Sequence, residues 1–295
     1  MKTIFLRIGS IILISLFLLS LVSTMSLASH EPVPHPLLIN GTILYVGGSG
    51  PGNFSKIQDA IDNASEGDIV FVYSGFYEEN IRITTSIQLI GAGNSTTIID
   101  GGMSDAVVSI SADDTIIQGF TIQNAKDDIN SAGVEITIAD NVYIVENIIQ
   151  NNRGLGIFLQ GPDTSAVKIM RNTIRNNSYG VYLFDSPQTL VLANDISNNG
   201  EGVYVVGSYA SALVNNTIAN KGLGIHLEST YNVVIFGNWV VNNANGVYAF
   251  NSSEISFSNN TIGWNRWNGL WTKDCNNNIV NGNTIVNNID VGLFL

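Results

Sequence analysis

A motif that recurs at a nearly fixed interval dominates residues 141–295 and constrains the fold of this 295-residue chain more than any other feature. Its copies read ENIIQNN (146–152), NTIRNN (172–177), NDISNN (194–199), NTIANK (216–221), NWVVNN (238–243), NTIGWN (260–265) and NTIVNN (283–288), after a weaker copy, GFTIQN (119–124). The central aliphatic residues, from Ile122 to Ile285, lie 22 to 27 residues apart, and a glycine follows each of them. A period this regular predicts a solenoid in which each repeat contacts only its neighbours.

Within each coil, three short segments alternate between apolar and polar residues, as expected for strands that bury one face. In one coil we expect Val167, Ile169, Ile174, Val181 and Leu183 to point inward, and Lys168, Met170 and Tyr182 to point outward. The inward pair after each glycine continues to Leu293 and Leu295. Stacked coils would place like residues in columns.

One asparagine column lies two residues before the central aliphatic residues. Its members are Asn147, Asn172, Asn194, Asn216, Asn238, Asn260 and Asn283. Asparagine tolerates left-handed backbone angles, and its amide can bond the same amide one coil away. We therefore assign this column a structural role.

The sequence divides into four predicted segments. Residues 1–28 have the basic start, apolar run and small-x-small end of an export signal, the alternative being an uncleaved anchor. Residues 29–43 are Pro-rich and are predicted to be a linker, residues 44–113 a cap and the first coils, and residues 114–295 the repeats. The chain stops at Leu295 without a recognisable cap. We expect either a further C-terminal domain or self-association through the open end.

The segment 44–113 begins with a strand and is then predicted to form a short helix. Ser55 can cap this helix, Ile57, Ala60, Ile61 and Ala64 have helical spacing, and Gly67 is expected to end it. A helix at this point would cover the open end of a solenoid.

Short β segments follow the helix, and two of their motifs resemble a known family. Gly75, Tyr77 and Glu79 form a G-x-Y-x-E element, and Ile87, Leu89, Gly91 and Gly93 form an I-x-L-x-G-x-G element. Both resemble the start of secreted right-handed parallel β-helix proteins such as pectin methylesterases. The repeats are similar to the NosD-like, carbohydrate-binding and sugar-hydrolase (CASH) type of the pectin-lyase-like superfold. The resemblance implies an all-β, single-stranded right-handed parallel β-helix with coils of about 22–24 residues, three short strands per coil and a short N-terminal capping helix.

Composition excludes several classes of protein. Charged residues make up 12% of the chain, and the net charge is -12 with no basic block, which excludes a nucleic-acid-binding footprint. Cys275 is the single cysteine, so no internal disulfide can form. We expect no membrane span after signal cleavage and a secreted or cell-envelope location.

The most informative outward column lies two residues after each glycine. It contains Glu135, Phe158, Tyr182, Tyr204, His226, Tyr248, Trp271 and Phe294, and two residues further along lie Gln160, Phe184, Val206, Glu228, Phe250 and Lys273. Exposed aromatic rings can lie against sugar faces. The candidate glycan-binding residues are Phe158, Tyr182, Tyr204, His226, Tyr248, Trp271 and Glu228. The alternative is that these rings stack on one another or lie under a neighbouring chain.

Catalytic and metal-binding patterns are weak in this sequence. The carboxylate candidates are the pairs Asp113–Asp114 and Asp127–Asp128, which fit turns, the residue Asp274, and Asp185 with Glu228, which lie two coils apart. The N-T-D and G-H-G elements of polygalacturonases are absent, as are the Q-D and D-F-I-F-G elements of pectin methylesterases. The copper-type ligands, His30, His35, His226, Met103, Met170 and Cys275, are scattered. We predict no catalytic residues, no metal and no cofactor.

These patterns favour an exported, non-catalytic β-helix of the cell surface that binds polysaccharide through its aromatic flank. Three alternatives stay open: a polysaccharide lyase or glycoside hydrolase, a structural or adhesion repeat of the envelope, and a copper-associated maturation protein of the NosD type.

Overall fold

The computed structural model describes residues 41–128 and 131–295. The predicted signal peptide, most of the predicted linker, and His30 and His35 lie outside the described residues. The first strand begins at Ile43, so the predicted linker overlaps it by one residue.

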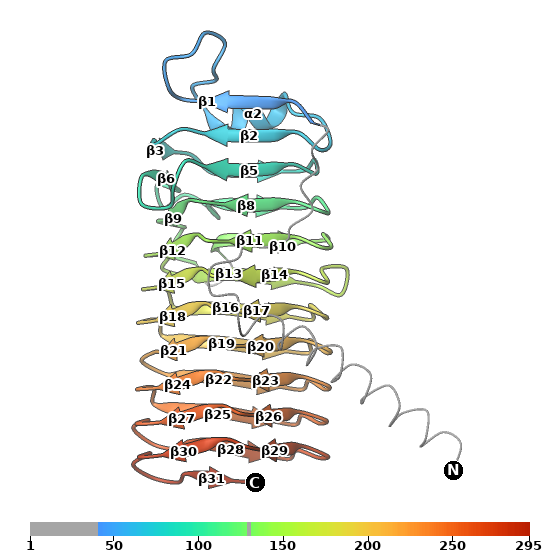
Figure 1. Ribbon diagram of the computed structural model, residues 1–295, viewed down its shortest axis with the longest axis vertical. Coiled ribbons are helices and arrows are strands. Elements are labelled where there is room, and N and C mark those ends of the chain that lie inside the picture. Colours follow the sequence, from blue (N-terminus) through green and yellow to red (C-terminus); the bar gives the residue numbers. More distant parts are fainter. Residues whose placement is uncertain (1–40, 129–130) are drawn as a thin grey trace, which may run out of the picture. The chain divides into compact units, whose positions relative to one another are not determined.

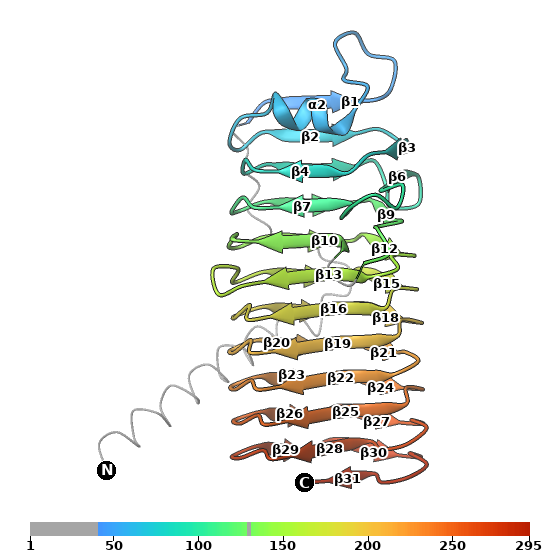
Figure 2. The ribbon, with the colours of Figure 1, turned by 180° about the vertical axis from the view of Figure 1, so that it is seen from behind.

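Three parallel sheets make up the fold, which we name A, B and C (Figures 1 and 2). Sheet A contains β1 (Ile43–Val46), β2 (Ile69–Val72), β5 (Gln88–Gly91), β8 (Ile116–Gln118), β11 (Tyr143–Val145), β14 (Lys168–Met170), β17 (Leu190–Leu192), β20 (Ala212–Val214), β23 (Val234–Phe236), β26 (Ser256–Ser258) and β29 (Ile279–Asn281). Sheet B contains β3 (Gly75–Glu78), β6 (Thr97–Asp100), β9 (Thr121–Gln123), β12 (Ile148–Gln150), β15 (Thr173–Arg175), β18 (Asp195–Ser197), β21 (Thr217–Ala219), β24 (Trp239–Val241), β27 (Thr261–Gly263) and β30 (Thr284–Val286). Sheet C contains β4 (Ile81–Ile83), β7 (Val108–Ile110), β10 (Ala132–Thr137), β13 (Leu155–Gln160), β16 (Tyr179–Phe184), β19 (Glu201–Val206), β22 (Leu223–Glu228), β25 (Asn245–Phe250), β28 (Leu270–Lys273) and β31 (Leu293–Phe294).

Each coil visits sheets A, B and C in turn, and successive coils stack in register. The central isoleucines predicted to share a column do pair, as in Ile149 with Ile174 and Ile174 with Ile196. The inward aliphatic residues are buried and form one continuous core. The predicted all-β parallel β-helix is therefore confirmed, and its stability comes from stacking, because one coil cannot bury its own apolar face.

Helix α2 (Ile57–Asp62) packs against β1, β2 and β4 and buries Ile57, Ala60 and Ile61 in the core (Figure 2). Two details of its prediction were wrong. Ser55 does not cap it; instead the Glu79 carboxylate accepts hydrogen bonds from the backbone N–H groups of Ile57 (2.9 Å) and Gln58 (3.0 Å). The helix ends at Asp62, before Gly67. The glutamate of the G-x-Y-x-E element thus caps a helix that precedes it.

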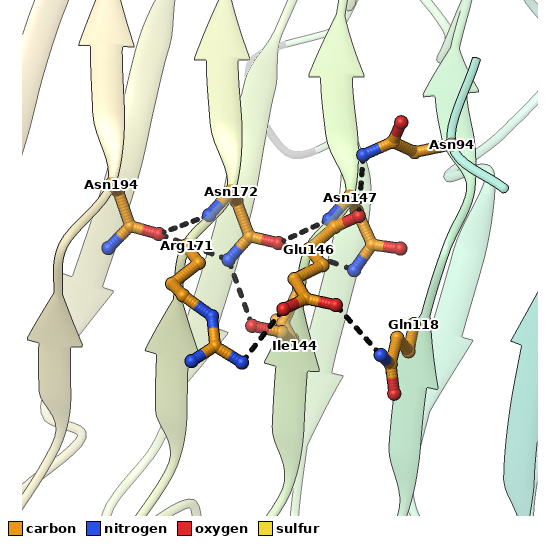
Figure 3. A network of polar contacts seen from close by, with 8 residues as sticks. All are labelled: Asn94, Gln118, Ile144, Glu146, Asn147, Arg171, Asn172 and Asn194. Carbon is orange, nitrogen blue, oxygen red and sulfur yellow. Dashed lines mark hydrogen bonds and ion pairs between the residues drawn. The ribbon is translucent and has the colours of Figure 1, made fainter. Parts of the chain in front are cut away.

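The predicted asparagine column forms a ladder inside the turn between sheets A and B (Figure 3). The amide oxygen of Asn172 accepts from the backbone N–H of Asn147 at 2.9 Å, and Asn194 does the same for Asn172. The side-chain amide of Asn172 also donates to the Ile144 carbonyl at 2.8 Å. These side chains are buried. The left-handed residue is the one before each asparagine, such as Arg171 (φ 54°), so the inward amide rather than a special φ explains the column.

A second asparagine ladder, which the sequence did not lead us to expect, lies inside the turn between sheets B and C. Its members are Asn152, Asn177, Asn199, Asn220, Asn243, Asn265 and Asn288. It also explains the glycine of each coil: at Gly224 a Cβ atom would lie 2.6 Å from the Gly246 carbonyl oxygen and 2.9 Å from the Asn243 amide nitrogen. Only glycine leaves room for the buried amide.

A polar strap crosses the outside of the turn between sheets A and B (Figure 3). The amide of Asn94, in the loop between β5 and β6, donates to the Glu146 carbonyl at 2.9 Å. The Glu146 carboxylate pairs with Arg171 at 2.8 Å and accepts from Gln118 at 2.9 Å. Thr121 donates to the Asn94 carbonyl at 2.6 Å. The loop is thereby tied to coils that follow it in the stack.

Two expectations about side-chain exposure were wrong. Met170 lies outside the core, as predicted, but is only 3% exposed because Val145 and Leu192 adjoin it in the same column. Leu293 pairs with Leu270 as expected, yet Leu293 and Leu295 are exposed because no described coil stacks beyond them. None of the helices in the part of the chain that the structure describes is long and apolar enough to span a membrane.

Candidate functional site

The predicted outward column lies on the outer face of sheet C and keeps its register throughout. Glu135 pairs with Phe158, and Tyr182, Tyr204, His226, Tyr248, Trp271 and Phe294 follow in successive coils. We call this set the sheet C column. Each member stands one coil, or ~4.8 Å, from the next, which is close enough for neighbouring rings to touch.

In the first half of the column the rings from Tyr182 to His226 stack face to face, whereas Phe158 is tilted by 33° to Tyr182. Tyr182 and Tyr204 have ring centroids 5.0 Å apart with planes 8° from parallel, and Tyr204 and His226 lie 4.2 Å apart at 9°. Phe158 is only 7% exposed and packs with Ala132 and Leu155. Here the ring faces are covered by neighbouring rings, so the column presents mainly ring edges.

In the second half the rings tilt away from one another. His226 and Tyr248 are inclined by 40°, Tyr248 and Trp271 by 47°, and Trp271 and Phe294 by 90°. A tilted ring does not cover its neighbour's face completely. Tyr248 and Trp271 are half-buried, and Phe294 at the end of the column is 54% exposed.

A titratable cluster sits where the two halves meet. His226 lies between two carboxylates, with Nδ1 3.9 Å from Oε2 of Glu201 and Nε2 4.0 Å from Oε2 of Glu228. The Tyr204 hydroxyl donates a hydrogen bond to the Glu228 carboxylate. Glu201 and Tyr204 come from β19 and His226 and Glu228 from β22, so adjacent coils build the cluster.

Burial controls the protonation of this cluster. It lowers the pKa of His226, an effect that the Glu228 charge partly opposes, so the imidazole is neutral at pH 7. It raises the pKa of Glu201. The pKa of Tyr204 is also raised, first by burial and then by the hydrogen bond to Glu228, which keeps this phenol protonated. The cluster therefore offers hydroxyl, imidazole and carboxyl groups for hydrogen bonding.

Asp185 and Glu228, which the sequence places two coils apart, have different surroundings. Glu228 contacts Tyr204 and His226, and Asp185 occupies a left-handed turn position (φ 49°) beside Gly207. Glu201 was missed. It stands directly before a coil glycine, where strict alternation from the outward Tyr204 would point it inward. Gly202 and Val203 are both buried, so the alternation breaks there and Glu201 lies on the outer face, paired with Tyr179.

The remaining acidic candidates belong to turns or surface pairs. Asp114 and Asp274 have positive φ angles of 54° and 53°. Asp113 accepts the Asp140 N–H at 2.8 Å, and Asp127 pairs with Arg153 at 3.2 Å. Among residues 41–128 and 131–295, no group of three His, Cys, Asp or Glu side chains has the arrangement of a metal site.

Comparison with known proteins defines the family. The family described as "Right handed beta helix region" matches residues 105–262, more than half of the chain. The chain belongs to this family.

Two relatives share shorter segments with this chain. A cell surface glycoprotein from Methanothermus fervidus is 35% identical over 101 residues, which cover 33% of this chain and 16% of the glycoprotein. A probable pectinesterase/pectinesterase inhibitor 17 from Arabidopsis thaliana is 33% identical over 99 residues, covering 30% of this chain and 19% of that protein. The matches thus span less than a fifth of either relative's length.

Solved structures show the same fold at low sequence identity. The A-module of the Azotobacter vinelandii mannuronan C-5 epimerase AlgE6 is 19% identical with a TM-score of 0.66, over 79% of this chain and 71% of that one. An alginate lyase from Paenibacillus is 13% identical with a TM-score of 0.64, over 80% of this chain and 95% of that one. These likenesses show the pectin-lyase-like fold over about four-fifths of this chain.

Proposed function

We propose that this chain is a cell-surface β-helix that binds a neutral polysaccharide along the outer face of sheet C. The observation that carries the proposal is the tilted part of the sheet C column. There the half-buried rings of Tyr248 and Trp271 are tilted by 47° to each other, beside the hydrogen-bonding cluster of Tyr204, His226 and Glu228. Sugars are bound by this combination, because their C–H faces stack on rings while their hydroxyls need polar partners.

The charges on this face favour a neutral ligand. Glu201 and Glu228 flank His226, and burial keeps that imidazole neutral, so it does not compensate the carboxylates. A uronate or sulfate placed here would meet like charge in a partly desolvated site, which is unfavourable. Hydroxyl groups meet no such penalty.

Two observations support the location. A relative is named as a cell surface glycoprotein, and residues 1–28 have the pattern of an export signal. In the proposed arrangement, residues 29–43 link the signal to the cap and first coils at 44–113, and the repeats of 114–295 carry the binding face.

Affinity electrophoresis of the purified full chain in gels that contain neutral polysaccharides, such as mannan, xyloglucan or dextran, tests the proposal. At least one polymer should retard the protein. The double variant Tyr248→Ser with Trp271→Ser should weaken that binding by about tenfold or more, as loss of central aromatic contacts does elsewhere. Tyr209 and Tyr231 form an exposed stacked pair (5.1 Å, 6°) in the turn between sheets C and A, outside the sheet C column, so Tyr231→Ser is the matched control. Equal retardation of both variants and the wild type would refute the binding face.

A polysaccharide hydrolase or lyase is the second candidate. Two carboxylates lie on opposite sides of His226, and the raised pKa of Glu201 is a property of general acids. This candidate predicts new reducing ends or unsaturated products from a polysaccharide, and their loss in Glu201→Gln. Binding without any product from the bound polymer would leave only the first candidate.

A further inference from the structure

The turn between sheets B and C contains extra basic residues in four coils. Gly222, Ala244 and Trp267 each donate a backbone hydrogen bond to the equivalent residue of the preceding coil. Each of the two basic residues directly follows an asparagine of the buried ladder and precedes a residue of this backbone ladder: Lys221 lies between Asn220 and Gly222, and Arg266 between Asn265 and Trp267. Both are extra residues that bulge from the coil. Arg153 likewise directly follows an asparagine of the buried ladder, Asn152. Lys126 follows Ala125, which stands, one coil before Asn152, at the position that asparagine occupies in the later coils.

Such a cluster of basic side chains is unusual in a chain with so negative a net charge. The sequence has 12 Lys and Arg residues, and without Lys2 and Arg7 ten remain, of which four lie on this turn. Lys126 pairs with Asp128 at 3.8 Å and Arg153 with Asp127 at 3.2 Å. Within the described residues, Lys221 and Arg266 have no acidic partner, and the Arg266 guanidinium donates to the Lys221 carbonyl two coils away. The Arg266 guanidinium therefore lies beside the backbone of Lys221, and both residues are exposed.

Exposed tryptophans adjoin these cations. Trp267 follows Arg266 and is 59% exposed, and Trp264 and Trp239 are each 46% exposed and stack at 6.0 Å and 28°. Trp264 has a φ of 54°, where the neighbouring coils have Asn242 and Asn287. Asparagine adopts this left-handed backbone conformation readily, whereas a bulky residue such as tryptophan is destabilised in it. Trp264 stacks on Trp239 and still leaves 46% of its surface exposed, where another molecule could contact it.

An open depression extends the same surface. It has a volume of about 510 Å³ and runs along the turn from the paired Asp127 and Arg153, past Ser178 and Gly200, to Lys221. Arg266 and Trp267 continue the line, so that it covers five coil steps, or roughly 24 Å at ~4.8 Å per coil. Asp290, one coil beyond Trp267, ends the basic surface.

We infer that this surface, from Arg153 to Trp267, binds an acidic polysaccharide. Lys221 and Arg266 would pair with carboxylate or sulfate groups, and sugar rings would lie on Trp264 and Trp267. Guanidinium groups suit such anions because they offer paired donors in one plane. The net charge of -12 opposes a dense polyanion such as a nucleic acid, whereas two local cations match a polymer with one charge per sugar.

This surface differs from the sheet C column in ligand charge, and its test is correspondingly separate. The probe is polygalacturonate, with its fully methyl-esterified form as the neutral counterpart. Affinity electrophoresis of the full chain should show binding to the acidic polymer at low salt, weakening as salt rises, because the attraction is local and screened. The esterified polymer should bind at least tenfold more weakly.

Two double variants separate the charges from the rings. Lys221→Gln with Arg266→Gln should lower the affinity for polygalacturonate at least tenfold, and so should Trp264→Asn with Trp267→Ala, in which the asparagine is the residue of the neighbouring coils. Lys56→Gln, an exposed cation near α2, is the control for loss of charge and should have no effect. Equal affinity for both polymers, an equal effect of Lys56→Gln, or tighter binding of a single-stranded oligonucleotide would overturn the inference. The melting temperature of each variant checks that the fold is intact.

Discussion

The interior asparagine ladders and the exterior sheet C column each receive one residue from every coil. They differ in how uniform the residue type is along the stack. The ladder position of the A–B turn holds asparagine in coil after coil, because each buried amide must satisfy backbone groups and the next amide. The exterior column changes from glutamate to phenylalanine, tyrosine, histidine and tryptophan over the same coils. The interior ladder position requires asparagine, whereas the exterior position accepts many residue types. Variation along an exterior column is therefore where function can be sought.

The largest expected difference is between the effects on stability of substituting two adjacent residues of one turn. Asn243 faces inward and exchanges hydrogen bonds with Asn220, Ile218 and Asn265, whereas Asn242 is exposed with a φ of 59°. Asn243→Leu should destabilise the fold by about 3 kcal/mol, because several buried groups lose their partners. Asn242→Gly should change stability by less than ~0.5 kcal/mol. Urea denaturation followed by circular dichroism measures both, and similar midpoints for the two variants would contradict the interior-exterior distinction.

A smaller loss is expected at the interior glycine column. A Cβ at Gly224 would lie 2.7 Å from the Val240 side chain and 2.9 Å from the Asn243 amide. Gly224→Ala should therefore cost about 2 kcal/mol through overpacking. At Gly93, the nearest contact of a Cβ is 3.4 Å, to the Thr96 hydroxyl, so Gly93→Ala is the matched control. Equal melting temperatures for the two alanine variants would show that the column is not tightly packed.

The exterior column should tolerate change better. Tyr204→Phe removes the hydrogen bond to Glu228 but keeps a ring to stack on Tyr182 and His226. We expect a loss of roughly 1 kcal/mol, because the site is partly open to water. Thermal melting gives the value, with Tyr231→Phe as control. A loss as large as that of Asn243→Leu would mean that the exterior column is as essential to folding as the interior ladder.

The smallest effect is a dependence of stability on pH. Because burial lowers the pKa of His226 below its ordinary 6.5, the unfolded chain binds a proton more readily than the folded one just below pH 6.5. The free energy of unfolding should therefore fall as pH drops from 6.5 through the folded pKa, and the loss should be on the order of 1 kcal/mol or less. His226→Gln should flatten this part of the profile of melting temperature against pH. An unchanged slope between pH 6.5 and 5 would assign the dependence to other groups.

The sequence predicted the coil, the three strands, the inward aliphatic columns and the register of the exterior column, because a repeat shows each of them many times. The sequence was less informative about residues whose role occurs in only one coil and is not repeated. Glu79 caps α2 from a later segment, which no local cap pattern could indicate. Glu201 joins the cluster around His226 from the adjacent coil, and the alternation breaks at Gly202, so the pattern that follows the glycine does not extend to it. Ring tilt, which separates covered from open aromatic faces, depends on packing details that spacing does not encode.

The strap formed by Asn94 also bears on how the stack comes apart. A solenoid with contacts only between neighbours frays from its ends, one coil after another. Asn94 bonds to Glu146, 52 residues further along the chain, and Glu146 in turn holds Gln118 and Arg171. The coils bridged by these contacts should open together as one cooperative unit, and amide hydrogen exchange should protect them as a block. The strap would thus give the stack a preferred end for opening.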